Sequence, residues 1–235
     1  MSTSKTSIRN RILAALPEKD YERILPQLEP VELPHGKILC EPDDPISHLY
    51  FVNEGMTSLV ALTEEGQSIE VGVIGKEGVL GFQAVFGGDM MQHRGLVQIP
   101  GAALRVKIGK FKEELDPLSV LHNLLMRYNY AMLTQITQSV VCNRFHEVEE
   151  RLARWLLICH DRAESDDLPL TQEFISIMLG ARRPGVNAAI GVLEKAELIH
   201  HSRGKVVVID RQGLEEVSCE CYRVAKKEFD RALST

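Results

Sequence analysis

Basic side chains are concentrated in the segment from Arg182 to Lys205. This segment holds five Lys or Arg residues and two acidic residues, Glu194 and Glu197, so its net charge is +3. The whole chain has 27 Lys and Arg residues against 33 Asp and Glu residues, which gives a net charge of −6. A basic segment in an acidic protein is typical of a surface that contacts the phosphates of a nucleic acid.

The residues around this basic segment, from Leu170 to Leu193, have the pattern of a helix-turn-helix. Thr171 suits a helix N-cap, and Gly180 suits the turn because glycine adopts a left-handed backbone at no steric cost. Pro184 is tolerated in the first turn of the second helix, where its missing N–H has no intrahelical partner. The positions that must face inward are all apolar: Ile175, Leu179, Ala181, Val186 and Ala189.

A β-hairpin with a basic tip is predicted after the second helix. Leu198 and Ile199 lie in its first strand, a Ser202-Arg203-Gly204-Lys205 turn follows, and Val206 to Ile209 form the second strand. A helix-turn-helix followed by such a hairpin is typical of a winged-helix domain. The alternative is a helix-turn-helix in a helical bundle that does not bind DNA, and the basic hairpin favours DNA.

We predict two kinds of contact to double-stranded DNA. Arg183 has a forked guanidinium that matches the edge of a guanine, and Asn187, one turn further on, reaches an adenine or a phosphate. Pro184 and Gly185 offer no side-chain hydrogen bond, so the shape of the DNA should contribute to recognition. The side chains expected on phosphates are Thr171, Arg182, Ser202, Arg203 and Lys205.

The histidines and cysteines do not predict a catalytic or metal-binding site. The histidines are scattered, with no nucleophile elbow or phosphate loop beside them, so we expect no catalytic residue and no enzyme. The five cysteines, an odd and scattered set, indicate free thiols in a reducing compartment. Cys219 and Cys221 alone suggest a metal, but on one helix they would point about 200° apart. We therefore expect no metal site and no cofactor.

The chain divides into four predicted parts. Residues 1–28 form N-terminal helices, 29–115 a β-barrel, 116–145 a dimerisation helix, and 146–235 a winged helix-turn-helix with a C-terminal helix. Short apolar or alternating runs between glycine and acidic turns predict a small antiparallel, jelly-roll-like barrel, so the expected fold class is α+β. The expected strands begin at Val31, Lys37, His48, Thr57, Ile69, Gly95 and Ala103, with a hairpin tip from Glu64 to Gln67.

A long helix is expected to begin after Asp116, at Pro117. Residues three and four apart in it form the heptad stripe of a coiled-coil seam. We predict a homodimer through Leu118, Leu121, Leu125, Tyr128, Met132, Gln135, Ser139 and Cys142. A second flank would cover the barrel: Val120, Leu124, Ala131 and Val141. A dimer would hold two recognition helices about 34 Å apart, one turn of DNA. The alternative is a single long helix that lies on its own barrel.

Two further helices are expected around the helix-turn-helix. The first is amphipathic and runs from Glu147 to His160, and the second is a single helix capped by Asp210 that ends near Leu233. No apolar run approaches the length of a membrane span, and the N-terminus lacks the apolar centre of a secretory signal. The cytoplasm is therefore the expected location.

The order of a barrel, a long helix and a winged helix resembles the Crp/Fnr family of bacterial transcription regulators, from about Leu25 to Ile209. The most specific segments are RLARWLL (Arg151 to Leu157), LTQEFI (Leu170 to Ile175) and MLG (Met178 to Gly180). The runs CNRFHEVEERLARWLL, LTQEF and CECYR indicate a divergent branch. The resemblance implies a DNA-binding regulator that receives a signal at its barrel and has RNA polymerase as a partner.

The predicted barrel departs from the members of this family that bind cyclic nucleotides. The segment from Gly75 to Gly88 resembles the turn in which those members hold the ribose with a glutamate, but Phe82 stands at that position. Arg94 stands near the phosphate position, and the following Gly95 offers no hydroxyl. We assign Phe82, Arg94 and Tyr128 to a candidate effector pocket, and we expect no tight binding of cyclic AMP.

The second helix of the DNA-binding motif also departs from the family. Its members often place arginine, glutamate and a second arginine there, where this chain has Arg183, Pro184 and Ala188, so a different operator is expected. The sequence predicts a homodimeric, sequence-specific DNA-binding transcription regulator with a sensing barrel. The alternative is a ligand-sensing barrel protein that acts through a protein partner rather than DNA.

Overall fold

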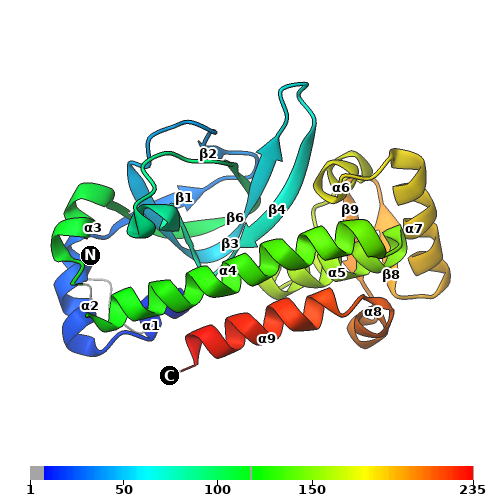
Figure 1. Ribbon diagram of the computed structural model, residues 1–235. Coiled ribbons are helices and arrows are strands. Elements are labelled where there is room, and N and C mark those ends of the chain that lie inside the picture. Colours follow the sequence, from blue (N-terminus) through cyan, green and yellow to red (C-terminus); the bar gives the residue numbers. More distant parts are fainter. Residues whose placement is uncertain (1–7, 117, 235) are drawn as a thin grey trace. The chain divides into compact units, whose positions relative to one another are not determined.

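The computed structural model describes residues 8–116 and 118–234, and the chain divides into two compact units. Unit 1 comprises the chain up to Leu59, Val73–Leu133 and the residues from Glu228 onward. Unit 2 comprises Val60–Gly72 and Thr134–Lys227. Figure 1 labels the elements of both. None of the described helices is long and apolar enough to cross a membrane.

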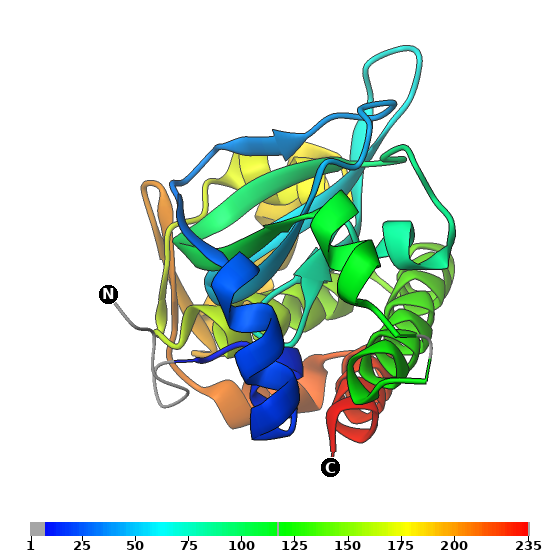
Figure 2. The same cartoon turned by 90° about the vertical axis from the view of Figure 1, so that its left-hand side faces the viewer.

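Unit 1 begins with the short helices α1 (Arg11–Ala14), α2 (Glu18–Ile24) and the 3-10 turn η2 (Leu25–Gln27). Asn10 caps α1, because its Oδ1 accepts a hydrogen bond from the N–H of Leu13. Its buried Nδ2 donates to the carbonyl oxygens of Val52 and Gly78, at 2.9 and 2.8 Å. These bonds hold the N-terminal helices, drawn in blue in Figure 2, against the sheet.

The sheet is antiparallel in every strand pair whose register is known, and its strands are ordered β1-β6-β3-β4, with β2 on β6 and β5 on β3. This order forms an open path rather than a closed ring, which is loosely jelly-roll-like and agrees with the predicted α+β fold. The strands are β1 (Glu29–Leu33), β2 (Ile38–Cys40), β3 (His48–Leu62), β4 (Ser68–Ile74), β5 (Val79–Leu80) and β6 (Arg94–Lys107).

Two of these strands are long, where the sequence predicted pairs of short strands. We expected breaks near Gly55 and Gly101, but β3 and β6 run through both glycines. A Cβ on Gly55 would lie 2.4 Å from the carbonyl oxygen of Ile99, and one on Gly101 would lie 2.1 Å from that of Glu54. Gly55 and Gly101 therefore let β3 and β6 approach each other closely, and neither glycine ends its strand.

Unit 1 also contains η3 (Phe82–Phe86), which lies between β5 and β6, and, after β6, α3 (Ile108–Glu114) and the first part of α4 (Val120–Phe145). The predicted start of the long helix is only partly within the described residues. Asp116 Oδ1 accepts a hydrogen bond from the N–H of Leu118 at 2.8 Å, whereas Pro117 lies outside them. The regular helix begins three residues later than expected, at Val120.

Unit 2 contains the winged helix. Helix α5 (Val148–Ala163) precedes α6 (Gln172–Leu179) and α7 (Arg183–Lys195). A capping box between Glu147 and Glu150 begins α5. The strands β7 (Asp167–Leu168), β8 (Ile199–Ser202) and β9 (Lys205–Val208) form a sheet in the order β7-β9-β8. The predicted winged-helix architecture is confirmed.

The C-terminal segment is not one helix, as predicted, but two. Helix α8 (Arg211–Val217) begins at its cap Asp210, whose Oδ1 accepts from the N–H of Gly213 at 3.0 Å. The backbone of Ser218 is extended, and a second helix, α9, runs from Cys221 to Leu233. The break contains no glycine or proline, so the residues gave no signal for it.

The face of α4 that we assigned to a dimer partner is largely buried by the chain itself. Exposure is 0% for Leu125 and Tyr128, 1% for Met132, 2% for Gln135 and 7% for Ser139. Within unit 1, the ring of Tyr128 packs edge-on against Phe82, 5.5 Å between centres, and lies 6.1 Å from Phe229. These five side chains of the predicted seam are therefore covered within the single chain, whereas Leu118 is 88% exposed and Leu121 is half-buried.

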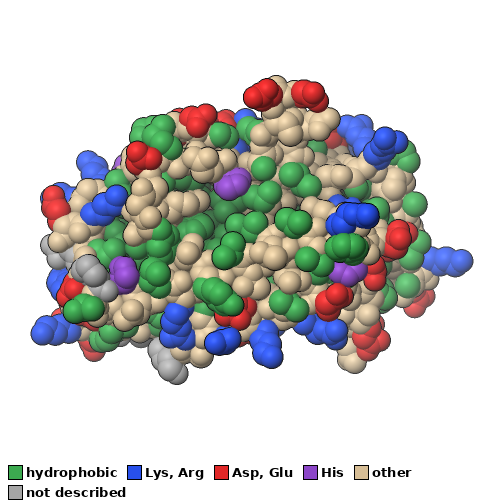
Figure 3. Space-filling model, viewed as in Figure 1, with side chains coloured by type: hydrophobic (Ala, Val, Ile, Leu, Met, Phe, Trp, Pro, Cys, Tyr) green, Lys and Arg blue, Asp and Glu red, His purple; other side chains and the backbone are tan. Residues whose placement is uncertain are grey.

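A different stripe of α4 is exposed. Met126, Tyr130, Leu133 and Val140 are 44%, 58%, 59% and 66% exposed, and Thr137 between them is exposed as well. These positions are separated by four, three, four and three residues, which is heptad spacing. Figure 3 shows hydrophobic side chains gathered along this helix. The structure thus places the coiled-coil pattern on the opposite face from the predicted one.

Candidate nucleic-acid interface

The turn between α6 and α7 has the geometry that the sequence predicts. Thr171 Oγ1 accepts a hydrogen bond from the N–H of Phe174 at 3.1 Å and caps α6. Gly180 has a φ of 56°, and a Cβ there would lie 2.6 Å from the side chain of Ile69. The N–H of Ala181 donates to the carbonyl of Ser176 at 3.1 Å, which closes the end of α6.

The two helices bury one side and expose the other. Ile175, Val186 and Ala189 are 0% exposed, and Leu179 is 3% exposed, so four of the five predicted inward positions are buried. The outer side of α7 presents Arg183, Pro184, Asn187 and Ala188 to solvent. Arg182 is the N-cap residue of α7, and the first turn contains no acidic side chain. The N-terminus of α7 therefore combines the positive end of the helix dipole with two arginine side chains, and this arrangement attracts anions.

Arg183, the predicted base-reading residue, forms an ion pair with Glu173 of α6. Both side chains are largely exposed, at 63% and 66%, so the pair is weak and opens readily for another partner. Arg183 is thereby held beside the turn before any ligand binds. Glu173 is not predictable as the partner of Arg183, because nothing in its spacing indicates which cation it meets.

The wing carries the remaining predicted contacts. In the β8–β9 hairpin Ile199 pairs with Val208 and Ser202 pairs with Lys205, which leaves Arg203 and Gly204 as the tip. Gly204 has a φ of 79°, a value that glycine adopts without strain. Ser202 and Arg203 are exposed. Lys205 forms an ion pair with Asp167 of β7 at 2.7 Å, a second acidic partner that the sequence did not predict.

Helix α5 supports the helix-turn-helix from within unit 2. Arg151 donates hydrogen bonds to the carbonyl oxygen of Leu179, at the end of α6, and to Asn143 Oδ1. Trp155 is 1% exposed, and its Nε1 donates to Glu70 Oε1 at 2.8 Å. Its ring also lies 6.4 Å from that of Phe174 in α6. These contacts explain why the RLARWLL segment stands directly before the reading motif.

The three candidate effector residues lie in unit 1, but two of them are packed against each other. Phe82 is 5% exposed and contacts the buried Tyr128 edge-on. Gly78 meets the other end of Tyr128, because a Cβ there would lie 2.4 Å from Tyr128 Oη. Arg94 is ion-paired with Glu41 at 2.9 Å. A cavity of about 250 Å³ in this unit is lined by other residues, among them His48 and Tyr50.

Unit 2 also brings together four residues that the sequence analysis left apart. The ligand atoms of Cys142, His146, Cys219 and Cys221 all lie within 4.8 Å of one another. The expectation that Cys219 and Cys221 diverge on one helix is wrong, because the chain is not helical between Ser218 and Glu220. The spacing Cys-x3-His from Cys142 to His146 was the signal that could have joined them to the pair.

Comparisons with known proteins agree with this architecture. Residues 30–116 match the model of a cyclic nucleotide-binding domain, and residues 150–217 match that of a Crp-like helix-turn-helix domain. The chain is 25% identical over 198 residues to the transcriptional regulator SdrP of Thermus thermophilus, which covers 81% of this chain and 94% of that protein. It is 22% identical over 182 residues to the global nitrogen regulator of Synechocystis sp., covering 74% and 81%.

A solved structure shares the fold. FixK2 from Bradyrhizobium japonicum superposes with a TM-score of 0.69 at 17% sequence identity, over 82% of this chain and 98% of that one.

Proposed function

The chain belongs to the Crp/Fnr family of transcription regulators, and on this premise we propose that it is a homodimer that binds specific DNA sequences through α7 and the wing. The observation that carries the proposal is the start of α7. Arg182 and Arg183 stand there with a helix N-terminus and no acid in the first turn, and the outer face beyond them is exposed. The basic wing tip adds further cations.

The predicted residues have two kinds of role in this proposal, reading bases and contacting phosphates. Arg183 reads a guanine, after release from Glu173, and Asn187 reaches an adenine or a phosphate. The remaining contacts position the protein on the phosphates and carry no sequence information. They come from Thr171, Arg182, Ser202, Arg203 and Lys205.

The exposed stripe of α4 is the proposed dimer interface. Met126, Tyr130, Leu133 and Val140 repeat at heptad spacing, which suits a helix pairing with a second copy of itself. Such a dimer presents two reading helices to two half-sites about 34 Å apart. This interface replaces the one proposed from the sequence, whose central side chains are buried.

The barrel is the proposed receiver of a signal, and cyclic AMP is not the proposed ligand. Phe82 offers no carboxylate for a ribose hydroxyl and is packed on Tyr128, while Arg94 already has the partner Glu41.

For a regulator of this type we also propose RNA polymerase as a partner and the cytoplasm as the location.

A gel-shift experiment separates this function from its alternative. Purified chain is mixed with the DNA upstream of its own coding sequence, with an excess of unrelated competitor DNA. A competitor-resistant complex is expected from a DNA-binding regulator. A barrel protein that acts through a protein partner would give no complex at any protein concentration.

A further inference from the structure

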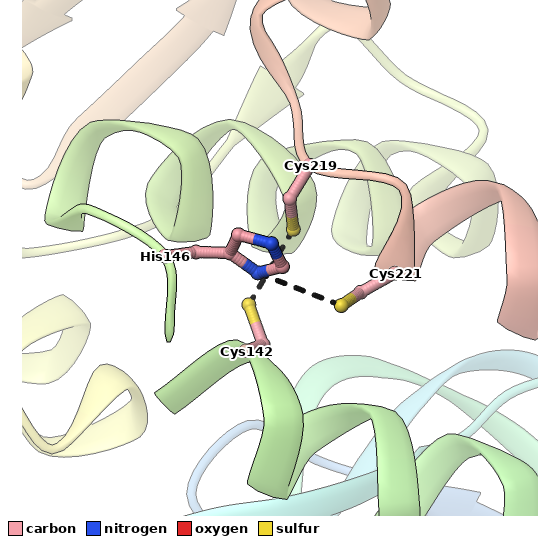
Figure 4. A group of neighbouring side chains, drawn as sticks. All are labelled: Cys142, His146, Cys219 and Cys221. Carbon is pink, nitrogen blue, oxygen red and sulfur yellow. Dashed lines mark hydrogen bonds between the residues drawn. The ribbon is translucent and has the colours of Figure 1, made fainter. Parts of the chain in front are cut away.

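Four side chains with metal-binding atoms converge in unit 2. Cys142 lies near the end of α4, His146 lies between α4 and α5, and Cys219 and Cys221 flank the break between α8 and α9. Figure 4 shows their side chains pointing toward a common centre. The three cysteines are buried, and no more than 4.8 Å separates any two of the four ligand atoms.

We propose that Cys142, His146, Cys219 and Cys221 bind one Zn²⁺ ion. Structural zinc sites are tetrahedral, and three cysteines with one histidine are among their usual ligand sets. With bonds of about 2.3 Å to sulfur, the ligand atoms of such a tetrahedron are about 3.8 Å apart. Cys142 Sγ lies 3.5 Å from Cys219 Sγ, and Cys221 Sγ lies 3.7 Å from His146 Nδ1. These two separations match the edge of a zinc tetrahedron, and no other pair of ligand atoms is more than 4.8 Å apart, so a shift of about 1 Å at most would close the site around one ion.

The second nitrogen of the histidine has the partner that a zinc ligand needs. His146 Nε2 lies 3.3 Å from Glu220 Oε2, and only 14% of the histidine side chain is exposed. A carboxylate that accepts the Nε2 proton fixes the ring and leaves the Nδ1 lone pair for a metal. Glu220 stands between the two cysteines of the CEC run, so one turn of chain supplies two ligands and the residue that orients a third.

Buried arginines provide the charge that balances such a site. Arg151 and Arg154 are 8% and 7% exposed, and neither forms an ion pair with a carboxylate within the described residues. The partners of Arg151 are a carbonyl and an amide oxygen, and Arg154 Nε is buried without a hydrogen-bond partner. Arg154 interacts electrostatically with all three cysteines. Three thiolates and Zn²⁺ carry a net negative charge, which would offset part of the positive charge of these buried arginines.

Two other states of the same sulfur atoms explain less of the geometry. A disulfide between Cys142 and Cys219 would involve only two of the converging side chains, so it would not explain why His146, Cys221 and Glu220 lie beside them. An iron–sulfur cluster places iron and sulfide between its ligands and would need them further apart than in this compact group. Because all four zinc positions are filled by protein, the proposed role is structural: the ion fastens the break between α8 and α9 to the end of α4.

Metal content of the full chain tests the proposal. The wild-type chain, purified under reducing conditions and dialysed against metal-free buffer, is expected to retain one zinc per chain in elemental analysis. Cys142→Ser and Cys221→Ser are expected to lose it. Cys40→Ser is the matched control and should retain it, since Cys40 lies in unit 1, where burial raises the pKa of its thiol to about 11.

A second measurement uses only the wild-type chain, in case a cysteine variant does not fold. The chain is stripped with a chelator and titrated with Co²⁺, whose tetrahedral thiolate complexes absorb strongly in the visible range. One equivalent should saturate the bands, and Zn²⁺ should abolish them. A chain of native helix content that binds neither ion would overturn the proposal. So would a Cys142–Cys219 disulfide in the freshly purified protein, or iron and sulfide in place of zinc.

The role of Glu220 has its own readout. Glu220→Gln removes the carboxylate that orients His146 and keeps all four ligands, so the affinity for zinc should fall by about tenfold in competition with a chelator. Affinity equal to the wild type would show that Glu220 does not position the histidine.

Discussion

At the scale of single residues, two cations of the proposed interface differ in their proposed role, although both are ion-paired in the free chain. One reads a base and the other contacts a phosphate. Arg183 is paired with Glu173 at the start of α7, and Lys205 is paired with Asp167 at the wing. Exposed pairs of this kind contribute at most about 1 kcal/mol, so DNA can displace the acid in both cases. What distinguishes them is position: only Arg183 stands on the helix that would enter the groove.

Replacement of each cation by alanine should separate base reading from phosphate contact. Arg183→Ala should cost about 1–3 kcal/mol on the preferred sequence and remove the preference at one base. Lys205→Ala should weaken binding to all sequences alike and lower the salt slope by about one. Fluorescence anisotropy on a panel of single-base variants measures both. Equal, sequence-independent losses from both variants would exclude a base-reading role for Arg183.

Glu173 is predicted to hold Arg183 in place for reading. Glu173→Gln removes a negative charge beside the DNA, so binding to random DNA should become tighter at low salt. Because the guanidinium loses its tether, the ratio of specific to random binding should fall. Glu64→Gln, the same change of charge in the exposed turn between β3 and β4, is the control. A ratio that rises in Glu173→Gln would contradict the tethering.

Residue types and their local spacing were enough to predict the caps and turns of this interface, because Thr171 and Gly180 form the two ends of α6 through residues close to them in the sequence. They were not enough for Glu173 and Asp167. The cations that these acids meet come from other elements, and only the packing of α6 against α7 and of β7 against β9 brings each pair together.

At the scale of elements, α4 shows where a periodic pattern is ambiguous. The helix carries apolar residues on more than one face, and the sequence assigned Leu125, Tyr128 and Met132 to a partner. In the structure these three fill the core, with Tyr128 between Phe82 and Phe229. Periodicity indicates that a helix has two apolar faces, but it does not indicate which one the rest of the chain covers.

A charge in the exposed stripe should prevent the proposed dimer. Leu133 is 59% exposed at the middle of the stripe, so Leu133→Glu should place two like charges in the seam and yield monomers. Light scattering coupled to size-exclusion chromatography measures the mass. Ile38→Glu, at a residue 44% exposed on β2, is the matched control and should leave the mass unchanged. A dimeric Leu133→Glu chain would exclude this interface.

The break between α8 and α9 is the element that the sequence predicted least well. The break contains no glycine or proline, and the weak preference of Ser218 for caps and turns does not by itself end a helix, so a continuous helix was the expected result. The convergence of Cys219 and Cys221 with two residues some 75 positions earlier depends on this break, as the pairings of Cys142 with Cys219 and of His146 with Cys221 show. Contacts over such a separation have no signature in local spacing.

At the scale of the whole molecule, the order of sheet, long helix and winged helix was predictable because each part has a local pattern of its own. A ligand for the sheet of unit 1 was not predictable, because a ligand is recognised by side chains gathered from several strands. Phe82 and Arg94 illustrate this: the sequence placed them near a nucleotide position, and the structure gives them Tyr128 and Glu41 as partners.

Cyclic AMP is therefore expected to bind weakly or not at all. A buried phosphate or ribose that lacks its charged hydrogen-bond partners loses about 2–3 kcal/mol for each of them. Titration calorimetry with the full chain should show no heat of binding at micromolar concentrations. Micromolar or tighter binding would contradict the proposed departure from the cyclic-nucleotide-binding members.

Selection of binding sites from a random duplex library tests the central claim most directly, since it needs no knowledge of the operator. We predict enrichment of a two-fold symmetric site with half-sites one helical turn apart, about 10 base pairs, and a shift of preference at one base per half-site for Arg183→Ala. A library that shows no enriched sequence after selection with the wild-type chain would contradict the proposal that α7 and the wing read DNA.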